Sequence, residues 1–255
     1  GTVLLVDTYD VLKSGVPNAI RTAREVLEPM GKKLIGIRLD SGDLAYLSKE
    51  ARKMLDEAGL SDCMIVASNS LDEYTISSLN RQGAKIDSYG VGERLITSSS
   101  TPVFGAVYKL VAIQKDGKFI PKIKISETAE KITNPGIKEV YRVYDENGKA
   151  VADYLAVKGE QIRDFDPVRY VDPVNYWKNR SFVGCRFKKL QVPVFEKGKR
   201  IYDLPDIEEI RQYVKDQLEN EIWEEEQRFE NAHTHYLDMS PAMFELKMSL
   251  LHEEN

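Results

Sequence analysis

The stretch LIGIRLDSGD, residues 34–43, passes directly from a continuous apolar run into a short polar loop. An apolar run bounded by polar turn residues predicts a buried strand, and a helical pattern follows this loop. Three other apolar runs end in the same way: VLLV at 3–6, MIVA at 64–67 and the short run at 86–89. The N-terminal part of the chain therefore predicts repeated strand–helix units.

A helix-like pattern links each of these strands to the next, with approximate bounds Pro17–Gly31, Leu44–Gly59 and Asp72–Gln82. Right-handed strand–helix–strand connections bring the carboxyl ends of parallel strands to one face, so we expect the four loops to gather around a single cleft. Four strands with three helices are about half of an eight-stranded barrel. The sequence predicts an α/β fold for residues 1–105, and the cleft is the candidate active site.

Beyond about Pro102 the apolar residues alternate with a period of two, which is typical of antiparallel strands. Turn signals at Asp116-Gly117 and Asn147-Gly148 predict two hairpins. The expected strands are Val107–Ile113, Phe119–Ile125, Val140–Tyr144, Val151–Val157 and Leu190–Phe195. We expect a β-rich module over residues 106–204.

The C-terminal region carries two helical patterns, from Pro205 to about Phe229 and from Pro241 to about His252. We expect these helices, in residues 205–255, to pack on the rest of the chain. The acidic run 219–226 is interpreted as a solvated helix face.

Composition limits the classes of partner. The formal net charge of −5 argues against nucleic acid, and no apolar stretch reaches the roughly 20 residues that cross a bilayer, which argues against a membrane. Cys63 and Cys185 lie far apart and fit a reduced, cytoplasmic protein. Because the chain begins with Gly1 and enters a strand almost at once, we expect it to be the C-terminal part of a longer polypeptide.

The loop after the second strand is the most informative group of polar residues. Strand alternation turns Arg38 and Asp40 to the same side, Gly42 lets a backbone approach closely, and Asp43 stands at the start of the next helix. Arginine neutralises phosphate, while Asp40 and Asp43 are candidates to accept sugar hydroxyls or to hold Mg²⁺. A salt bridge with a helix cap explains the same residues equally well.

Two other loops add candidate ligand contacts. Ser68, Asn69 and Ser70 supply hydroxyl and amide groups. The number of these polar side chains exceeds what the cap of a single helix requires, so ligand contact is favoured. The segment Gly90-Val91-Gly92 offers backbone N–H groups to an anion, although a bare GxG is more often a plain turn.

Asp7 and Asp10 follow the first strand. One of the two carboxylates is a candidate to orient a histidine or to bind a metal, and the other is a candidate to cap the following segment. His233, His235 and His252 all lie in the C-terminal region, and a packing or surface role is expected for each.

The assembled motifs resemble the nicotinate phosphoribosyltransferase family, and the resemblance covers nearly the whole chain. The matching segments are VDTYD, IGIRLDSGDLAYLSKEARKMLDEAG, IVASNSLDEYTI, GVGERLITS, AVYKLV and VPVFEKGKRIY. The resemblance implies an irregular TIM-like α/β barrel of the type II phosphoribosyltransferases, a β-rich domain and a homodimer. The implied reaction joins nicotinate to phosphoribosyl pyrophosphate, giving nicotinate mononucleotide and pyrophosphate, with Mg²⁺ and coupled ATP hydrolysis.

The resemblance also implies roles for single residues. Asp7 matches the carboxylate that partners a phosphorylatable histidine, which in the family lies upstream of this segment. The match extends to three further groups: Arg38, Asp40 and Asp43 around ribose, pyrophosphate and Mg²⁺; Ser68, Asn69 and Ser70 as a sugar-phosphate loop; and Gly90, Val91 and Gly92 as the loop for the 5′-phosphate.

Two alternatives stay open. Nicotinamide phosphoribosyltransferase shares the architecture and a similar RxDSGD loop. A non-catalytic fragment that binds sugar phosphate is the alternative of another class, because the implied histidine is not among these residues.

Overall fold

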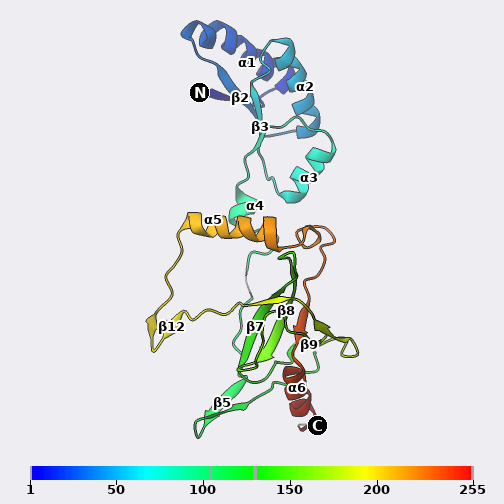
Figure 1. The fold of residues 1–255 in the computed structure, drawn as a ribbon. Helices are drawn as coiled ribbons and strands as arrows, with labels where there is room; N and C mark the ends of the chain where they lie inside the picture. Colours follow the sequence, from blue (N-terminus) through cyan, green and yellow to red (C-terminus); the bar gives the residue numbers. More distant parts are fainter. Residues whose placement is uncertain (1, 104, 129–130, 254–255) are drawn as a thin grey trace. The chain divides into compact units, whose positions relative to one another are not determined.

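The computed structural model describes residues 2–103, 105–128 and 131–253, and it divides into two units, 1–106 and 107–255 (Figure 1). The first unit contains a four-stranded parallel sheet in the order β1-β2-β3-β4. The strands are β1 (Thr2–Leu5), β2 (Leu34–Leu39), β3 (Met64–Ala67) and β4 (Ser88–Tyr89). The strand–loop pattern of the sequence is confirmed, and β4 is shorter than expected.

The helical segment between β1 and β2 begins earlier than Pro17. It comprises a π-helical turn (Val11–Gly15), α1 (Val16–Thr22), a second π-helical turn (Ala23–Leu27) and a 3₁₀ turn (Glu28–Met30). The side chain of Asp10 starts it by accepting hydrogen bonds from the N–H groups of Leu12 and Lys13. Asp10 is therefore the capping carboxylate of the pair that follows the first strand.

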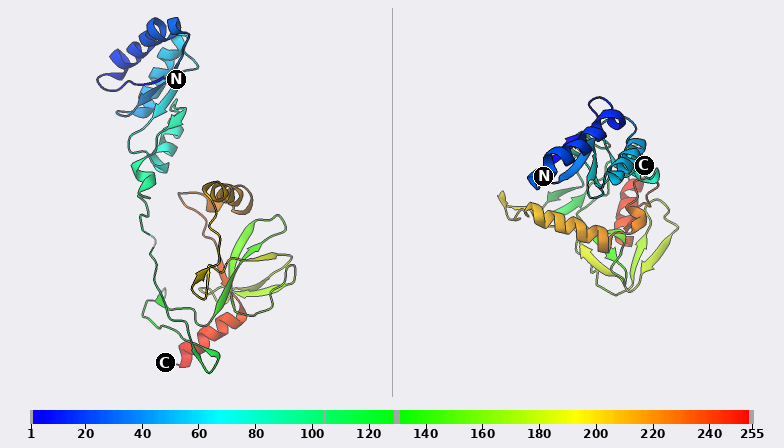
Figure 2. Two further views of the ribbon diagram at one scale, coloured as in Figure 1. Left: turned by 90° about the vertical axis from the view of Figure 1, so that its left-hand side faces the viewer. Right: turned by 90° about the horizontal axis from the view of Figure 1, so that it is seen from above.

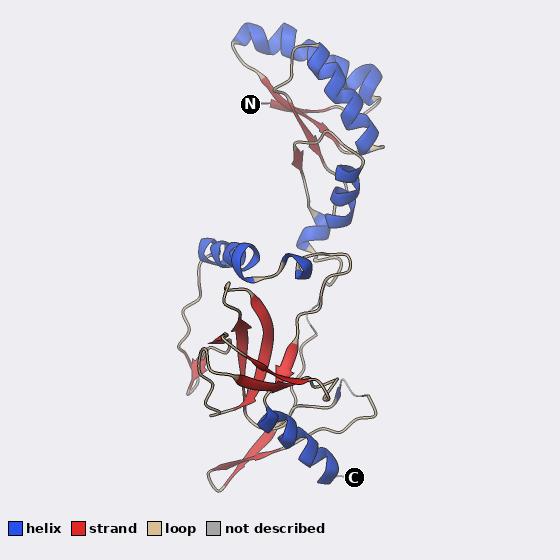
Figure 3. Ribbon diagram, turned by 45° about the vertical axis from the view of Figure 1, so that its right-hand side comes forward, coloured by secondary structure: helices blue, strands red, loops and turns tan. Residues whose placement is uncertain are grey.

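The remaining helices of the first unit are α2 (Leu44–Glu57), α3 (Glu73–Arg81) and the short α4 (Glu93–Ile96). Side chains from α1 and α2 pack with those of the sheet in one core, and Figure 3 shows the helices beside the strands. The most deeply buried members include Val16, Ile37, Leu39, Ala51, Leu55 and Ile65. Val3 and Leu5 on β1 remain exposed, as do Ile35 on β2 and Met64 on β3.

Gly15 marks the tightest packing of the first unit. A Cβ atom at this position would lie 1.8 Å from the carbonyl oxygen of Val6, far inside van der Waals contact. The absence of a side chain at Gly15 thus lets the start of α1 lie directly against the end of the first strand.

The second unit is built on a six-stranded sheet in the order β10-β9-β14-β8-β7-β11. These strands are β7 (Lys138–Tyr144), β8 (Ala150–Val157), β9 (Val168–Val171), β10 (Asn179–Phe182), β11 (Arg186–Lys189) and β14 (Leu237–Met239). The pairs are antiparallel except β14 with β8. The chain is therefore a mixed α/β fold with both parallel and antiparallel sheets.

The two predicted hairpins are confirmed, with shorter strands in the first. It joins β5 (Ala112–Lys115) to β6 (Lys118–Pro121) through Asp116 and Gly117, both of which have positive φ. The predicted strand Leu190–Phe195 is wrong: β11 ends at Lys189, and the next pair is β12 (Phe195–Glu196) with β13 (Lys199–Arg200). A short apolar run does not distinguish a strand from an extended connection, and this one includes Pro193.

The first C-terminal helix is shorter than predicted. Helix α5 (Ile207–Asp216) passes into a π-helical turn (Gln217–Glu221), and the helical run to Phe229 does not continue beyond a 3₁₀ turn (Glu224–Glu226). Its apolar stripe is exposed, including Ile207 and Val214.

Helix α6 (Pro241–Glu253), drawn in red in Figure 2, packs on the six-stranded sheet. Its Met243 is fully buried against Leu155 of β8 and Met239 of β14. Among the described residues, no helix has the length and apolar character that crossing a membrane requires.

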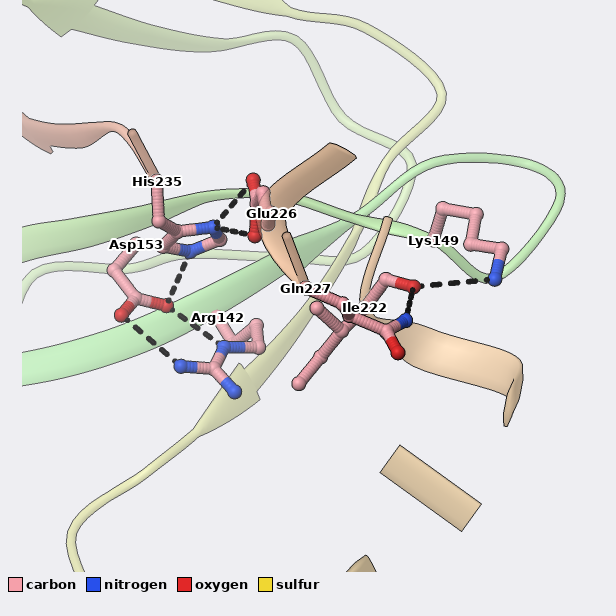
Figure 4. Close-up of polar contacts among 7 residues, drawn as sticks. All are labelled: Arg142, Lys149, Asp153, Ile222, Glu226, Gln227 and His235. Atoms are coloured by element: carbon pink, nitrogen blue, oxygen red, sulfur yellow. Dashed lines mark hydrogen bonds and ion pairs between the residues drawn. The ribbon is translucent and has the colours of Figure 1, made fainter. Parts of the chain in front are cut away.

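A polar cluster ties the segment before β14 to the sheet (Figure 4). The ring of His235 lies between two carboxylates, with Nδ1 3.1 Å from Glu226 and Nε2 3.3 Å from Asp153. Arg142 of β7 donates to both oxygens of the same Asp153 carboxylate, at 2.9 and 3.2 Å. His235 thus packs within a polar cluster. This agrees with the packing role expected for it.

Candidate functional site

The first and second strand-end loops are joined by the carboxylate of Asp7. Its Oδ2 accepts a 2.9 Å hydrogen bond from the N–H of Asp40 and a 2.6 Å bond from the hydroxyl of Ser41. Because this carboxylate fixes the backbone at Asp40, it determines where that side chain stands.

Asp40 links the second loop to the third. Its Oδ2 accepts a 2.8 Å bond from Nη2 of Arg38 and a 2.6 Å bond from Oγ of Ser68. The hydrogen bond from Ser68, followed by the hydrogen bond and charge of Arg38, holds the pKa of the Asp40 carboxyl below its usual value. Asp40 is therefore an anion at neutral pH, and it remains partly exposed beside the exposed guanidinium of Arg38.

The third and fourth loops are also in contact. The N–H of Gly90 donates to the carbonyl of Ala67 at 2.7 Å, and a Cβ at Gly90 would lie 3.4 Å from Cβ of Ser68. Arg94 of α4 forms an ion pair with Asp72 at 2.5 Å. The four loops therefore form one continuous surface at the carboxyl ends of the strands, as the strand–helix pattern predicts.

The third loop has an unusual backbone. Asn69 (φ 90°) and Ser70 (φ 50°) are consecutive non-glycine residues in the left-handed region. Such conformations are costly for residues with a Cβ and tend to occur where the surrounding structure holds them for function. Neither residue caps α3, because the side chain of Asp72 does so through the N–H of Thr75. The group Ser68–Ser70 is therefore not needed for capping.

The structural alternative for the second loop is also present. Arg38 and Asp40 form an ion pair, and Asp43 caps α2 by accepting from the N–H of Tyr46 at 3.0 Å. Both interactions lie at the surface, where ion pairs add little stability, so they do not by themselves account for the cluster. Each of the two carboxylates has one engaged oxygen, since Asp43 Oδ1 caps the helix and Asp40 Oδ2 accepts from Arg38 and Ser68.

The expectation for Gly90-Val91-Gly92 needs one correction. The N–H of Gly90 is bonded to Ala67 and is not free for an anion. The N–H groups of Val91 and Gly92 donate to no backbone carbonyl within the described part of the chain. Any anion contact in this loop therefore falls to these two amides and not to three.

A pocket of about 270 Å³ lies beside the first loop, and its lining includes Thr8, Tyr9, Gly15 and Asn18. Arg38, Asp40 and Ser68 are not among its lining residues. The ionic cluster is therefore not part of the wall of this pocket.

The structure provides one observation that bears on a metal at this surface. Within the described residues, no group of three or more His, Cys, Asp or Glu side chains is arranged to hold a metal ion. Magnesium is commonly held by one or two carboxylates together with substrate phosphates and water. Asp40 and Asp43 are two carboxylates of this surface, and a cage made by the protein alone is not present among the described residues.

Sequence reasoning missed two contributors to this surface. Ser41 bonds to Asp7, and Arg94 connects α4 to the third loop through Asp72. Ser41 lies inside the DSGD motif and Arg94 directly follows the GxG segment, so proximity to the motifs was the available signal. The left-handed backbone at Asn69 and Ser70 left no sequence signal, since neither is glycine.

Comparison with known proteins identifies the family to which the chain is similar. Residues 137–247 match the family model for the nicotinate phosphoribosyltransferase C-terminal domain. A nicotinate phosphoribosyltransferase of Bacillus subtilis (strain 168) is 48% identical over 252 residues, covering 98% of this chain and 51% of the relative. The nicotinate phosphoribosyltransferase of Dictyostelium discoideum is 38% identical over 260 residues, covering 96% of this chain and 43% of the relative.

A solved structure shares the fold as well. The crystal structure of human nicotinic acid phosphoribosyltransferase superposes with a TM-score of 0.76 at 26% identity, covering 98% of this chain and 46% of that chain. The present chain spans about half the length of the relatives that it matches.

Proposed function

The chain belongs to the nicotinate phosphoribosyltransferase family, and we propose that the four loops of its first unit bind phosphoribosyl pyrophosphate for transfer of the phosphoribosyl group to nicotinate. The products are nicotinate mononucleotide and pyrophosphate, a step of NAD biosynthesis. The observation that carries the proposal is the Arg38–Asp40–Ser68 cluster, in which a cation, an anion and a hydroxyl from neighbouring strands meet at one exposed point.

The cluster suits a displacement at the anomeric carbon of ribose. As pyrophosphate departs, positive charge develops on the ribosyl centre, and an ionised carboxylate at Asp40 is placed to stabilise it or to accept a ribose hydroxyl. The guanidinium of Arg38 pairs with phosphate oxygens of the leaving group. Because both groups are fixed by hydrogen bonds before the substrate arrives, little reorganisation is needed during the reaction.

Other binding roles follow the same surface. We assign the 5′-phosphate to the amides of Val91 and Gly92 and sugar-phosphate contacts to Ser68, Asn69 and Ser70. Asp40 and Asp43 are the residues that would hold Mg²⁺, which would supply positive charge to neutralise the departing pyrophosphate. Asp7 is assigned to position the second loop and, from the family resemblance, to partner a phosphorylatable histidine.

Several properties of the whole protein are included in the proposal. In this proposal, ATP is a coupled substrate of the whole protein. The whole protein is a homodimer with shared active sites, and the first unit is part of a TIM-like barrel. The four consecutive parallel strands agree with a barrel segment. Two buried, unpaired cysteines agree with a reduced cytoplasmic location.

The test is phosphoribosyl transfer by the full-length polypeptide with Arg38→Ala and Asp40→Ala. Each variant is expected to lower kcat/KM for phosphoribosyl pyrophosphate at least 100-fold with a melting temperature within a few degrees of the parent. Lys33→Ala removes a cation that is more exposed than Arg38 and is likewise paired with an aspartate, Asp62, and this control should retain activity. Unchanged turnover in both site variants contradicts the proposal.

Parallel assays with nicotinate and nicotinamide separate the two related activities, and greater turnover of nicotinamide favours the alternative enzyme. The non-catalytic alternative is tested on the 255-residue chain. Binding of phosphoribosyl pyrophosphate without transfer or ATP hydrolysis, with the same result for the full-length polypeptide, favours a sugar-phosphate-binding role.

A further inference from the structure

The second unit contains a pocket of about 430 Å³ that the reaction assigned to the first unit does not use. It lies against the face of the six-stranded sheet formed by β8, β9, β10 and β14. Its lining combines apolar and aromatic side chains with four charged ones: Val151, Ala152, Tyr170, Asp172, Lys178, Arg180, Phe182, Tyr236 and Asp238. Its volume is in the range that small-molecule ligands occupy.

Asp238 is the unusual member of this lining. The residue is only 8% exposed, and among the described residues its carboxylate makes no hydrogen bond or ion pair. Burial, with a smaller contribution from the nearby charge of Asp172, raises the pKa of Asp238 to about 6. A largely buried carboxylate that makes no hydrogen bond within the described residues, and whose oxygens still reach the pocket, is available to a ligand.

The neighbouring acidic residue has a structural role. The carboxylate of Asp172 accepts hydrogen bonds from the N–H groups of Val174 and Asn175, both at 2.8 Å, and from the side-chain amide of Asn175 at 3.1 Å. These contacts form the turn before β10. Asp238 is therefore the carboxylate of the pocket that remains without a partner.

Two cations stand at the exposed side of the pocket. Lys178 and Arg180 are exposed residues on or beside β10, and no ion pair of either side chain is present within the described residues. The charges in the lining are thus divided, with a buried anion at Asp238 and exposed cations at Lys178 and Arg180.

Aromatic rings share this lining with the charged residues. Tyr170 and Phe182 stack with ring centroids 4.3 Å apart, and Tyr236 completes the aromatic part of the lining. Aromatic faces attract cations and stack on planar rings. The pocket therefore favours a planar cation near the buried carboxylate, attached to an anionic group that reaches the lysine and arginine.

We propose that this pocket binds a pyridinium nucleotide, with the ring cation beside Asp238 and the phosphate at Lys178 and Arg180. This inference rests on the proposed function, because joining nicotinate to ribose at the ring nitrogen creates a permanently charged pyridinium that carries a 5′-phosphate. Neither reactant combines these two features. The second unit thus contains a site that recognises the product of the reaction and distinguishes it from the reactants.

The test uses the 255-residue chain and three probes: nicotinate mononucleotide, nicotinate alone and ribose 5-phosphate alone. NMR titration with the nucleotide is expected to shift the signals of residues 170–182 and 236–238. Each half-ligand is expected to bind at least tenfold more weakly than the nucleotide. Shifts at residues 38–41 and 68–70 report the first-unit site separately, so failure of this inference is distinct from failure of the proposed function.

Two variants test the charges. Asp238→Asn keeps the shape of the side chain, and Arg180→Met removes an exposed cation; each should weaken binding of nicotinate mononucleotide in the pocket at least tenfold. Arg200→Met, an exposed substitution on β13, is the control and should leave affinity unchanged. No shifts at 170–182 and 236–238, or equally tight binding of ribose 5-phosphate, overturns the inference.

Discussion

The hydroxyl of Ser68 donates a 2.6 Å hydrogen bond to Oδ2 of Asp40, across two neighbouring parallel strands. The same oxygen faces Arg38, so the ionised carboxylate is stabilised from two directions. Because an alcohol and a guanidinium are both donors here, the cluster favours the charged form of Asp40 without burying it.

Ser68→Ala is expected to raise the pKa of the Asp40 carboxyl toward its ordinary value, because the largest cause of the lowering is removed. The measurement is an NMR titration of the Asp40 side-chain carbon between about pH 2 and 6. A carboxyl whose pKa is lowered by folding stabilises the folded protein at pH values above its unfolded-state pKa, and this stabilisation is lost as the pH falls. Because the variant lacks part of it, the variant should lose less stability than the parent on acidification. Ser70→Ala, in the same loop, is the control, and an equal shift there contradicts the assignment.

Asp7→Ala is expected to free the second loop. The substitution leaves the Asp40 N–H and the Ser41 hydroxyl without their acceptor, which costs about 1–3 kcal/mol when such groups are shielded from water. Hydrogen exchange at the Asp40 amide should quicken, while exchange in the core of α2 should change only as global stability does. Asp7→Asn keeps one acceptor oxygen and should show a smaller effect; equal protection in all three proteins would count against a bridging role.

Gly15→Ala tests the close approach to Val6. The added Cβ would lie 1.8 Å from a backbone oxygen, so the backbone must move, and we expect a loss of roughly 3 kcal/mol or more in urea denaturation. Gly59→Ala is a matched contrast: its surroundings are open, but its φ of +77° is unfavourable for alanine. That variant should lose only about 1 kcal/mol. A smaller effect at Gly15 than at Gly59 would show that the packing is not tight.

Asp238→Asn is expected to stabilise the second unit at neutral pH. A folded-state pKa of about 6 lies above the ordinary 3.8, so the folded protein holds the proton more strongly and stability from this group falls as pH rises from about 4 to 6. The variant does not titrate, so its advantage over the parent should grow across that interval to on the order of 3 kcal/mol.

The charged and titratable groups around Asp238 in the pocket are Asp172, Lys178, Arg180, Tyr170 and Tyr236, and the comparison with the parent protein holds them constant. Denaturation at pH 4 and pH 7.5 measures the difference. The exposed Asp166→Asn is the control, which should show no pH-dependent gain. A pH-independent difference for Asp238→Asn would exclude the raised pKa.

The convergence of the four loops was predictable because it depends on periodicity and connection handedness alone. Strand alternation likewise placed Arg38 and Asp40 on one side, and the structure joins them in an ion pair. Sequence could not decide which carboxylates cap helices. Asp10, Asp43 and Asp72 do so, whereas Asp7 and Asp40 bind neighbouring loops, and the difference depends on where each helix begins.

Other features depend on contacts between distant parts of the chain. Asp238 is buried because β14 pairs with β8, placing it opposite Tyr154, and no local pattern predicts that pairing. The boundary between β11 and β12 is set by pairing of β11 with β7 and not by the apolar run that follows it. The left-handed Asn69 and Ser70 are likewise imposed by the connection between β3 and α3.

In the sheet of the first unit, the strands lie side by side in the same order in which they follow one another along the chain. Thr2 pairs with Leu34, Gly36 with Met64 and Val66 with Ser88, so each strand emerges next to a partner that already exists. Short sequence separation between partners favours rapid docking. Asp40 is held by Asp7, which precedes it in the chain, and by Ser68, which follows the third strand. A nascent chain that ends before the third strand therefore lacks the Arg38–Asp40–Ser68 cluster, even if its first two strands have paired.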